Sequence, residues 1–232
     1  MYKNMFIILL LAGFGLLLGS FLLTHHEYLS LPQLPAYYAD NTAPEVGAAN
    51  VVTAVVVTYR GFDTLGEVTI LFVAASLIAM FLKHSKAPRH DRHPRPSSVI
   101  LSTSQKLLFP LIVLFGAYVF ANGHLTPGGG FQGGAIIATG FLLLLMANPQ
   151  AEFKHGLLNA IESISGTSYV IIGILGAILG LGFLDNRFIS LGQLGTLFSA
   201  GAIPVIYSLI GLKVGAELSN ILHHLNEVQN EE

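Results

Sequence analysis

Long apolar runs separated by short polar stretches dominate the pattern of this 232-residue chain. A helix that crosses a membrane needs about 20 mostly apolar residues, within a range of about 17–25. The runs are continuous rather than alternating, and lipid offers no partners to backbone groups, so the pattern predicts helices. The six predicted spans cover residues 4–23, 64–82, 104–121, 131–147, 167–184 and 194–214.

Two further segments refine this prediction. Residues 46–59 are apolar and rich in valine but too short to cross a membrane straight, which favours a re-entrant or interfacial helix. The first run follows Lys3 as in a signal peptide, yet it exceeds the usual apolar length of about 7–15 residues, and no small-x-small cleavage site precedes His25. We therefore expect an all-α integral membrane protein with six transmembrane helices plus a short re-entrant or interfacial helix near 46–59.

Composition excludes several classes of protein. Hydrophobic residues make up 53% of the chain and charged residues 10%, against about 25% charged residues in a soluble domain. This disfavours a soluble enzyme, a disordered tail and a nucleic-acid-binding domain, and the formal net charge of −2 offers no basic footprint for nucleic acid. The absence of cysteine excludes disulfides and cysteine-ligated iron–sulfur or nickel centres on this chain.

Basic residues concentrate in one stretch around the end of the second predicted span and the start of the third. Six of the 11 lysines and arginines are Lys83, Lys86, Arg89, Arg92, Arg95 and Lys106. Because short loops rich in Lys and Arg stay in the cytoplasm, we expect both termini on the cytoplasmic side of the cell's inner (plasma) membrane.

The same stretch divides the chain into expected units. Residues 1–83 form a two-span unit, 84–98 a basic cytoplasmic linker, 99–222 a four-span domain and 223–232 an acidic tail. His84, His90 and His93 could bind a metal together, but a solvated, proline-rich linker is the favoured interpretation. We therefore expect neither a metal site nor a cofactor.

A cluster of ionisable residues lies at the start of the second span. Arg60, Asp63 and Glu67 are spaced i, i+3 and i+7, so on a helix they share one face. At membrane depth such residues usually face a protein interior or a water cavity, which indicates an ion path where Glu67 exchanges protons and Arg60 tunes its pKa. In an equally weighted alternative, the Arg60–Asp63 pair pins the span at the interface, and Asp63 or Glu67 caps the helix.

A glycine-rich string, NGHLTPGGGFQGG at residues 122–134, joins the third and fourth spans. One interpretation is a broken element beside an ion path, where His124 titrates and Gln132 donates hydrogen bonds. On chemistry alone we favour a tight hairpin whose glycines pack closely against a neighbouring helix. The motif comprises Pro127, Gly128, Gly129, Gly130, Phe131, Gln132, Gly133 and Gly134.

The remaining signals indicate no catalytic chemistry. Pro204 predicts a static kink in the sixth span, and Lys213 and Glu217 are interpreted as a surface pair at its cytoplasmic end. A phosphate-binding loop, a dinucleotide fingerprint, a nucleophile elbow and an HExxH motif are absent from the sequence. We therefore expect no enzyme activity within this chain.

Two strings carry a family resemblance. HLTPGGGFQGG, residues 124–134, is similar to the MrpB (MnhB) component of the Mrp-type multisubunit cation/proton antiporters, and this resemblance extends over about residues 98–222. NVVTAVVVTYRGFDTLGE, residues 50–67, resembles the C-terminal end of the large MrpA component, which stands alone as a small protein, MbhE, in membrane-bound hydrogenases of the same superfamily. The chain thus looks like a fusion of two adjacent family segments.

The resemblance implies a hetero-oligomeric membrane complex related to the membrane arm of respiratory complex I. Such complexes exchange protons for sodium or another monovalent cation. It also implies ion-path roles for Arg60 and Glu67, with Asp63 between them, and partners that are other membrane subunits of an Mrp-type or related complex.

Three functions stay open at this point. The leading hypothesis is a non-catalytic subunit of a cation/proton antiporter, with sodium as the preferred cation. The second is a membrane-arm subunit of a redox-driven ion-pumping complex such as a hydrogenase. The third is a pure scaffold that only holds other helices.

Overall fold

The computed structural model describes residues 2–23, 31–84, 97–151 and 155–231, and helices dominate these ranges. The chain forms two compact units, Met1–Tyr37 and Tyr38–Glu232. The first unit contains α1 (Tyr2–Leu23), whose apolar stretch covers Met5–Ser20. Its apolar side chains are exposed on every side, as expected for a helix surrounded by lipid or by membrane partners. Helix α2 (Gln33–Asn41) spans the boundary between the units.

Five described helices are long and apolar enough to cross a membrane. They are α4 (Gly61–His84), α5 (Val99–Ala121), α6 (Gly130–Ala147), α7 (His155–Leu179) and α8 (Ile203–Glu231). With α1 they account for the six predicted apolar runs, and no strand occurs in the described ranges. The predicted all-α membrane fold is therefore confirmed.

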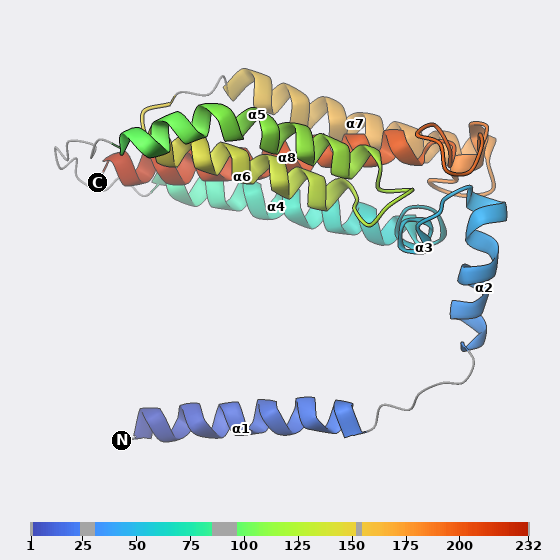
Figure 1. Ribbon diagram of the computed structural model, residues 1–232, viewed down its shortest axis with the longest axis horizontal. Coiled ribbons are helices and arrows are strands. Elements are labelled where there is room, and N and C mark those ends of the chain that lie inside the picture. Colours follow the sequence, from blue (N-terminus) through green and yellow to red (C-terminus); the bar gives the residue numbers. More distant parts are fainter. Residues whose placement is uncertain (1, 24–30, 85–96, 152–154, 232) are drawn as a thin grey trace. The chain divides into compact units, whose positions relative to one another are not determined.

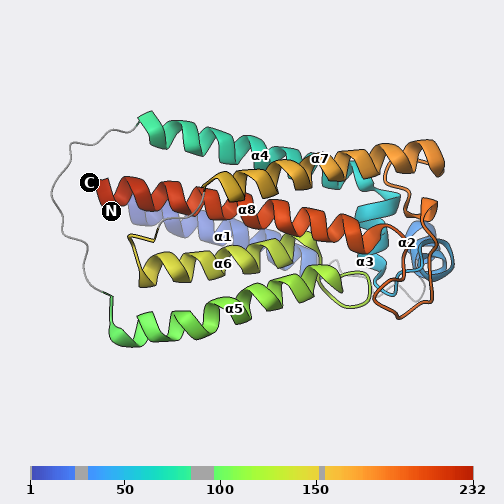
Figure 2. The ribbon, with the colours of Figure 1, turned by 90° about the horizontal axis from the view of Figure 1, so that it is seen from above.

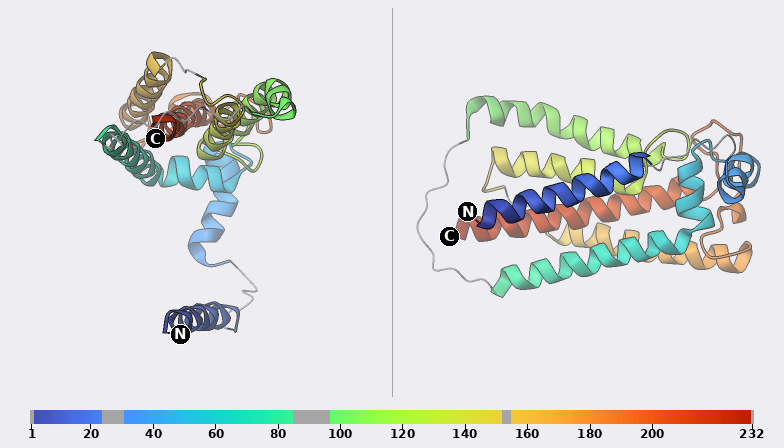
Figure 3. Two further views of the ribbon diagram at one scale, coloured as in Figure 1. Left: turned by 90° about the vertical axis from the view of Figure 1, so that its left-hand side faces the viewer. Right: turned by 90° about the horizontal axis from the view of Figure 1, so that it is seen from below.

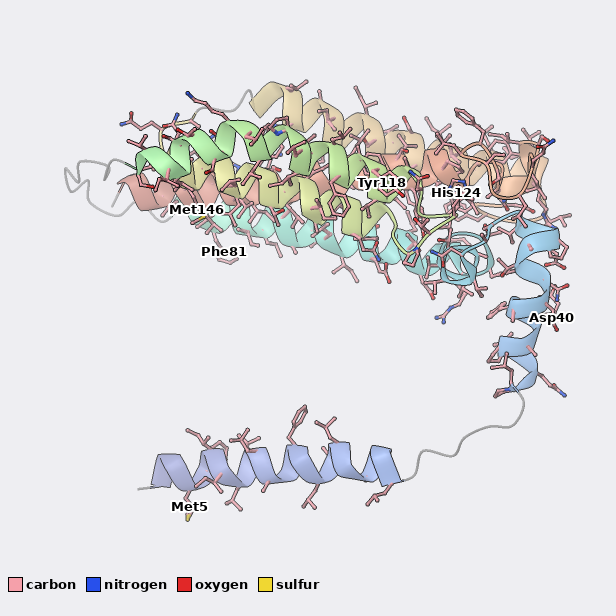
Figure 4. All side chains as sticks on the ribbon, viewed as in Figure 1. Met5, Asp40, Phe81, Tyr118, His124 and Met146 are labelled. Carbon is pink, nitrogen blue, oxygen red and sulfur yellow. The ribbon has the colours of Figure 1, made fainter. Side chains whose placement is uncertain are left out.

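Helix α8 is the centre of the second unit. It packs against α4, α5, α6 and α7, and Figures 2 and 3 show it running between its neighbours. In its apolar window 61% of the residues are buried, whereas only 6% are buried in α4 and in α5. Figure 4 accordingly shows the exposed side chains Phe81, Tyr118 and Met146 on the outer helices. Those faces are available to lipid or to neighbouring subunits.

The sixth predicted span is wrong in its position. Its helix begins at Ile203 rather than near residue 194 and continues to Glu231, through the predicted acidic tail. The preceding segment is broken by positive φ angles at residues such as Gly192 and Gly201. Pro204 therefore lies in the first turn of α8, where its missing N–H leaves no hydrogen bond unmade, so it starts the helix instead of kinking it.

The fifth predicted span is also displaced. The apolar pattern predicts residues 167–184, whereas α7 begins twelve positions earlier, at His155, and ends at Leu179. The polar side chains of Asn159 and Glu162 interrupt the apolar pattern and conceal the first turns of this helix. The start of α7 was therefore missed because polar residues lie inside this helix, whereas the start of α8 was misplaced because the segment before it is not helical.

The segment predicted as a re-entrant or interfacial helix forms short helical turns at one end of the helix bundle (Figure 1). These turns are η1 (Thr42–Val46), α3 (Val51–Thr53) and η2 (Ala54–Tyr59). The side-chain oxygen of Asn50 caps α3 by accepting two backbone N–H groups of the following turn. Ala54 and Val57 are fully buried. Protein therefore encloses this segment, which suits irregular backbone in a membrane protein.

The predicted basic linker at 84–98 and its histidines fall almost entirely on residues 85–96, which lie outside the described residues. The cytoplasmic placement of this stretch stays a prediction.

A buried carboxylate organises the loop between α7 and α8. Asp185 is 4% exposed and accepts the backbone N–H groups of Leu181 at 2.8 Å and Arg187 at 2.9 Å. It also pairs with the Arg187 guanidinium at 2.8 Å. The next residue, Asn186, donates its amide to carbonyl oxygens of η1 and of the segment before α8, at 2.8 and 2.9 Å. These bonds join segments that are far apart in the sequence.

Replacing Asp185 with asparagine should weaken this loop. Hydrogen bonds from Arg187 lower the pKa of Asp185 to about 2. Because the folded-state pKa is depressed, the carboxylate contributes fully above its ordinary pKa of 3.8, and this contribution is lost as the pH falls toward about 2. We expect Asp185→Asn to lower the free energy of unfolding by about 1–3 kcal/mol near neutral pH.

Thermal unfolding of the purified protein measures this effect, and the acid dependence of the variant should be flatter than that of the parent below about pH 4. Asp40→Asn is the matched control because Asp40 is exposed on α2. Equal stability of the two variants would contradict the organising role of Asp185.

Candidate functional site

The charged string at the start of α4 forms an ion pair on the surface of the second unit. Arg60 and Asp63 pair at 2.5 Å, with side chains that are 62% and 51% exposed. Asp63 lies in the first turn of α4, where the helix dipole favours a carboxylate. Its backbone N–H donates to the Arg60 carbonyl oxygen at 2.9 Å. This geometry matches the structural alternative, in which the pair fixes the start of the helix.

Glu67 lies one turn further along an exposed face of α4. Its charge acts on the hydroxyl of Tyr169 in α7, a residue that is 1% exposed. Another face of α4 is buried through Thr64 and Val68. The chain by itself therefore leaves the three charged residues uncovered. Their ion-path roles stay predictions that need a neighbouring subunit over this face.

The glycine-rich string lies where three helices are in backbone contact. A Cβ added at Gly133 would lie 2.6 Å from the Gly116 carbonyl oxygen of α5, and one added at Gly134 would lie 2.8 Å from the Gly211 carbonyl oxygen of α8. A side chain at Gly130 would likewise overlap α8. The string forms the contact surface between α5, α6 and α8, as in the favoured hairpin interpretation.

Other members of the string lie differently. Pro127 and Gln132 are exposed, whereas Phe131 is partly buried against the core. The side-chain oxygen of Gln132 lies close to Gly129, where an added Cβ would be 2.8 Å from it. The predicted donor role of Gln132 on an ion path stays a prediction.

His124 is fully buried at the end of the bundle that carries the irregular turns (Figure 4). Its carbonyl oxygen accepts the backbone N–H groups of Ala49 and Asn50, each at 3.0 Å, and its Nε2 lies 3.3 Å from the Thr196 carbonyl oxygen. Burial lowers the pKa of His124, which favours the neutral ring. His124 thus joins three loops, and its titration on an ion path stays a prediction.

The same junction brings together the two strings that carry the family resemblance. Thr53 donates its hydroxyl to the Gly123 carbonyl oxygen at 2.6 Å and accepts the hydroxyl of Tyr207 at 3.1 Å. The amide of Asn50 donates to the carbonyl oxygens of Gly123 and Thr126 at 2.9 and 3.1 Å. Segments about 70 residues apart in the sequence are therefore bonded directly.

A buried ion pair lies in the middle of α8, where the sequence predicted a surface pair at the end of a span. Lys213 and Glu217 bond one helical turn apart, with side chains that are 8% and 0% exposed. The second carboxylate oxygen of Glu217, Oε2, is buried without a hydrogen-bond partner. Lys213 Nζ lies 4.9 Å from the centre of the Phe72 ring of α4, within cation–π range. The prediction was wrong because the span was placed too early in the sequence.

A cleft of about 320 Å³ between α4, α7 and α8 opens beside Lys213, whereas Glu217 lies behind this lysine and does not line the cleft. Its polar lining consists of Thr69, Glu162, Ser163, Thr167, Tyr169 and Lys213. Glu162 accepts a hydrogen bond from the Asn220 amide at 3.3 Å, and its charge interacts with that of Glu217. Two carboxylates and one ammonium group therefore lie near one another on α7 and α8, with Lys213 and Glu217 buried and Glu162 partly exposed.

Sequence reasoning missed this cluster because it took charges as the ends of spans. The candidate membrane span of α8 runs from Ile203 to Val228, so Lys213 and Glu217 fall inside it. The available signal in the sequence was the apolar residues that continue after Glu217, namely Leu218, Ile221 and Leu222. Among the described residues, no group of three or more His, Cys, Asp or Glu could hold a metal ion.

This fold and these sites define a helical membrane protein with ionisable residues inside its spans, a class that includes subunits of ion-transporting complexes. The chain belongs to the MnhB family, because residues 100–220 match the domain related to the MnhB subunit of Na+/H+ antiporters. Residues 2–98 match MbhE, a subunit of MBH. The predicted family resemblance is confirmed in both parts of the chain.

Two solved membrane complexes contain similar chains. One is the membrane-bound sulfane sulfur reductase (MBS), an archaeal respiratory membrane complex, with a TM-score of 0.82 and 44% identity over 97% of this chain and 98% of that chain. The other is the Mrp complex from Dietzia sp. DQ12-45-1b, with a TM-score of 0.78 and 25% identity over 97% of this chain and 26% of that chain. Protein MJ1307 of Methanocaldococcus jannaschii is 33% identical over 196 residues, which are 73% of this chain and 74% of that protein.

Replacing Gly133 with alanine should impair the packing of α5 against α6. The added methyl group would lie 2.6 Å from a backbone oxygen that cannot move independently, so we expect a loss of about 1–3 kcal/mol in stability. Thermal unfolding and the yield of assembled complex measure it. In the control Gly156→Ala, no atom lies within 4 Å of the new Cβ. If the two variants are equally stable, the contact has no such importance.

Acidification should loosen the junction around His124. Because burial lowers the pKa of His124 in the folded state, the unfolded chain binds the proton more readily, and stability falls as the pH drops through the ordinary value of 6.5. Hydrogen exchange of residues 122–129, corrected for intrinsic rates, should therefore rise between about pH 7.5 and 5.5. His124→Gln should abolish this pH dependence. Equal protection of the parent protein at both pH values would contradict the expectation.

Proposed function

We propose that this chain is a non-catalytic membrane subunit of a multisubunit cation/proton antiporter in which sodium is the exchanged cation. The proposal rests on the match of residues 100–220 to the domain related to the MnhB subunit of Na+/H+ antiporters. Its partners are then other membrane subunits, protons and the cation. The complex lies in the cell's inner membrane, with both termini of this chain in the cytoplasm.

The exposed face of α4 supports an ion path shared with a neighbouring subunit. Arg60 is paired with Asp63, so Glu67 is the carboxylate of this string that no described residue pairs with. An uncompensated carboxylate on an apolar helix is unfavourable in lipid. A partner subunit that covers this face would enclose Glu67 in a hydrated interface, where it can exchange protons.

A specific observation favours a second candidate, in which the same membrane module belongs to a redox-driven respiratory complex. The match to the sulfane sulfur reductase complex covers almost the whole of both chains, at 44% identity. The similar Dietzia chain is much longer, since this chain covers only 26% of it. The arrangement of segments in this chain is therefore closer to that of the redox complex. In that case the redox centres lie on other subunits, because this chain has no cysteine.

Purification of the native complex through a tag on this chain separates the two candidates. Co-purifying Mrp-type subunits without iron–sulfur proteins would support the antiporter. Iron–sulfur-bearing partners would support the redox-driven complex. Purification of the chain without any membrane partner would contradict both.

Transport by the reconstituted complex tests the ion path. We expect Glu67→Gln to lower sodium-dependent proton movement about tenfold or more, equivalent to about 1.4 kcal/mol or more in the barrier. The control is Asp40→Asn, which removes an exposed carboxylate on α2. A fully assembled Glu67→Gln complex with unchanged transport would leave a pure scaffold as the better description.

A further inference from the structure

The charges that α7 and α8 carry around the buried Lys213–Glu217 pair do not balance. Glu162, Lys213 and Glu217 are the ionisable Asp, Glu, Lys or Arg residues of these two spans outside the last turns of α8. Two carboxylates and one ammonium group carry a net charge of −1 when all three are ionised. An excess charge inside apolar protein is unfavourable. The cluster therefore becomes neutral when it binds one additional positive charge.

Glu217 offers a specific position for that charge. Its side chain is 0% exposed, and Lys213 bonds only to Oε1. Oε2 is buried and has no hydrogen-bond partner. A bare ionised oxygen in such surroundings is unfavourable, so a proton on this atom would remove both the excess charge and much of the desolvation penalty.

The neighbouring cleft brings space for water up to Lys213, the partner of Glu217. It is lined by Glu162 and Lys213 together with hydroxyl groups of Ser163, Thr167 and Tyr169. One water molecule needs about 10–15 Å³ of cavity volume. The cleft of about 320 Å³ is therefore large enough for several water molecules. Hydroxyl and carboxylate groups along its wall can hydrogen-bond to these waters.

We propose that Glu217 is a proton-binding site of this chain, which exchanges its proton with water in the cleft beside Lys213 and Glu162. A hydronium ion in the cleft gives up one proton, with Glu162 as the intermediate acceptor, and becomes water. A new O–H bond then forms at Oε2 of Glu217, while Lys213 stays an ammonium group. No electrons are transferred, and the net charge of the cluster changes from −1 to 0. The inference rests on the proposed function for its purpose, namely proton exchange by the complex.

A proton fits this position better than a metal cation. An alkali cation needs a shell of several oxygen ligands, whereas Glu217 presents one open oxygen beside the positive charge of Lys213. Few other groups titrate nearby: α6 has no ionisable side chain. The other described titratable groups on α4, α5, α7 and α8 are Asp63, Glu67, Lys106, Tyr118, Glu162, Tyr169, Tyr207, His223, His224 and Glu227.

Infrared difference spectroscopy of the purified complex tests the proposal directly. A pH change should reveal the C=O band of a protonated, buried carboxyl group. Glu217→Gln should lose this band, whereas the control Glu227→Gln should keep it, because Glu227 is 45% exposed near the end of the same helix. Lys213→Gln should shift the midpoint of the band by about one pH unit or more, because a charged partner is removed.

Further outcomes separate this proposal from the proposed function. A complex that exchanges no cations contradicts the function, while the infrared band still decides the proton site. A band that persists in Glu217→Gln, or that responds to sodium at constant pH, overturns the proton site. If Glu217→Gln does not assemble, Glu217→Asp keeps a carboxyl group, and an unchanged band in that variant also overturns it.

Discussion

Direct backbone contact between α5, α6 and α8 is the constraint on which the second unit depends. In a membrane, apolar side chains gain little by leaving lipid, so helices associate mainly through close packing. Glycines at positions 116, 133, 134 and 211 remove the side chains that would hold these backbones apart. Helix α8 can therefore lie at the centre of its neighbours, and the polar groups that it carries are enclosed with it.

This central position produces two different polar regions along one helix. Near its start, Tyr207 reaches Thr53 and closes the junction around His124, where each loop is fixed by short hydrogen bonds. Further along the helix, Lys213 lines a cleft and bonds to the buried Glu217. The first region joins three loops around His124, whose Nδ1 has no hydrogen-bond partner, and the second combines an unpartnered carboxylate oxygen with space for water near Lys213.

The sequence predicted the positions of helices whose faces are exposed to lipid. It failed to predict the boundaries of the helices that pack around buried charges. The runs that became α1, α4, α5 and α6 were located closely, since apolar length is sufficient for helices with exposed faces. The start of α7 was missed because Asn159 and Glu162 interrupt the apolar pattern, and the end of α8 was missed because Lys213 and Glu217 were expected at a membrane surface. Charged residues usually mark the ends of a membrane span, but a charge can lie in the middle of a span that other helices surround. Close packing of the glycine string followed from composition, whereas the burial of His124 depends on Thr196, 72 residues away.

Stability alone does not account for the Lys213–Glu217 pair. Removing two charges from water is expensive, and replacing a buried ion pair with well-packed apolar residues is often neutral or stabilising. Ridge-forming apolar side chains would pack the centre of α8 equally well, as Ile206 and Ile210 do earlier in the same helix. The pair is also incompletely satisfied, since one carboxylate oxygen has no donor. A carboxylate that could gain a proton at that oxygen, and whose lysine partner lines a cleft that can hold water, is better explained by the exchange of charge than by the packing of helices.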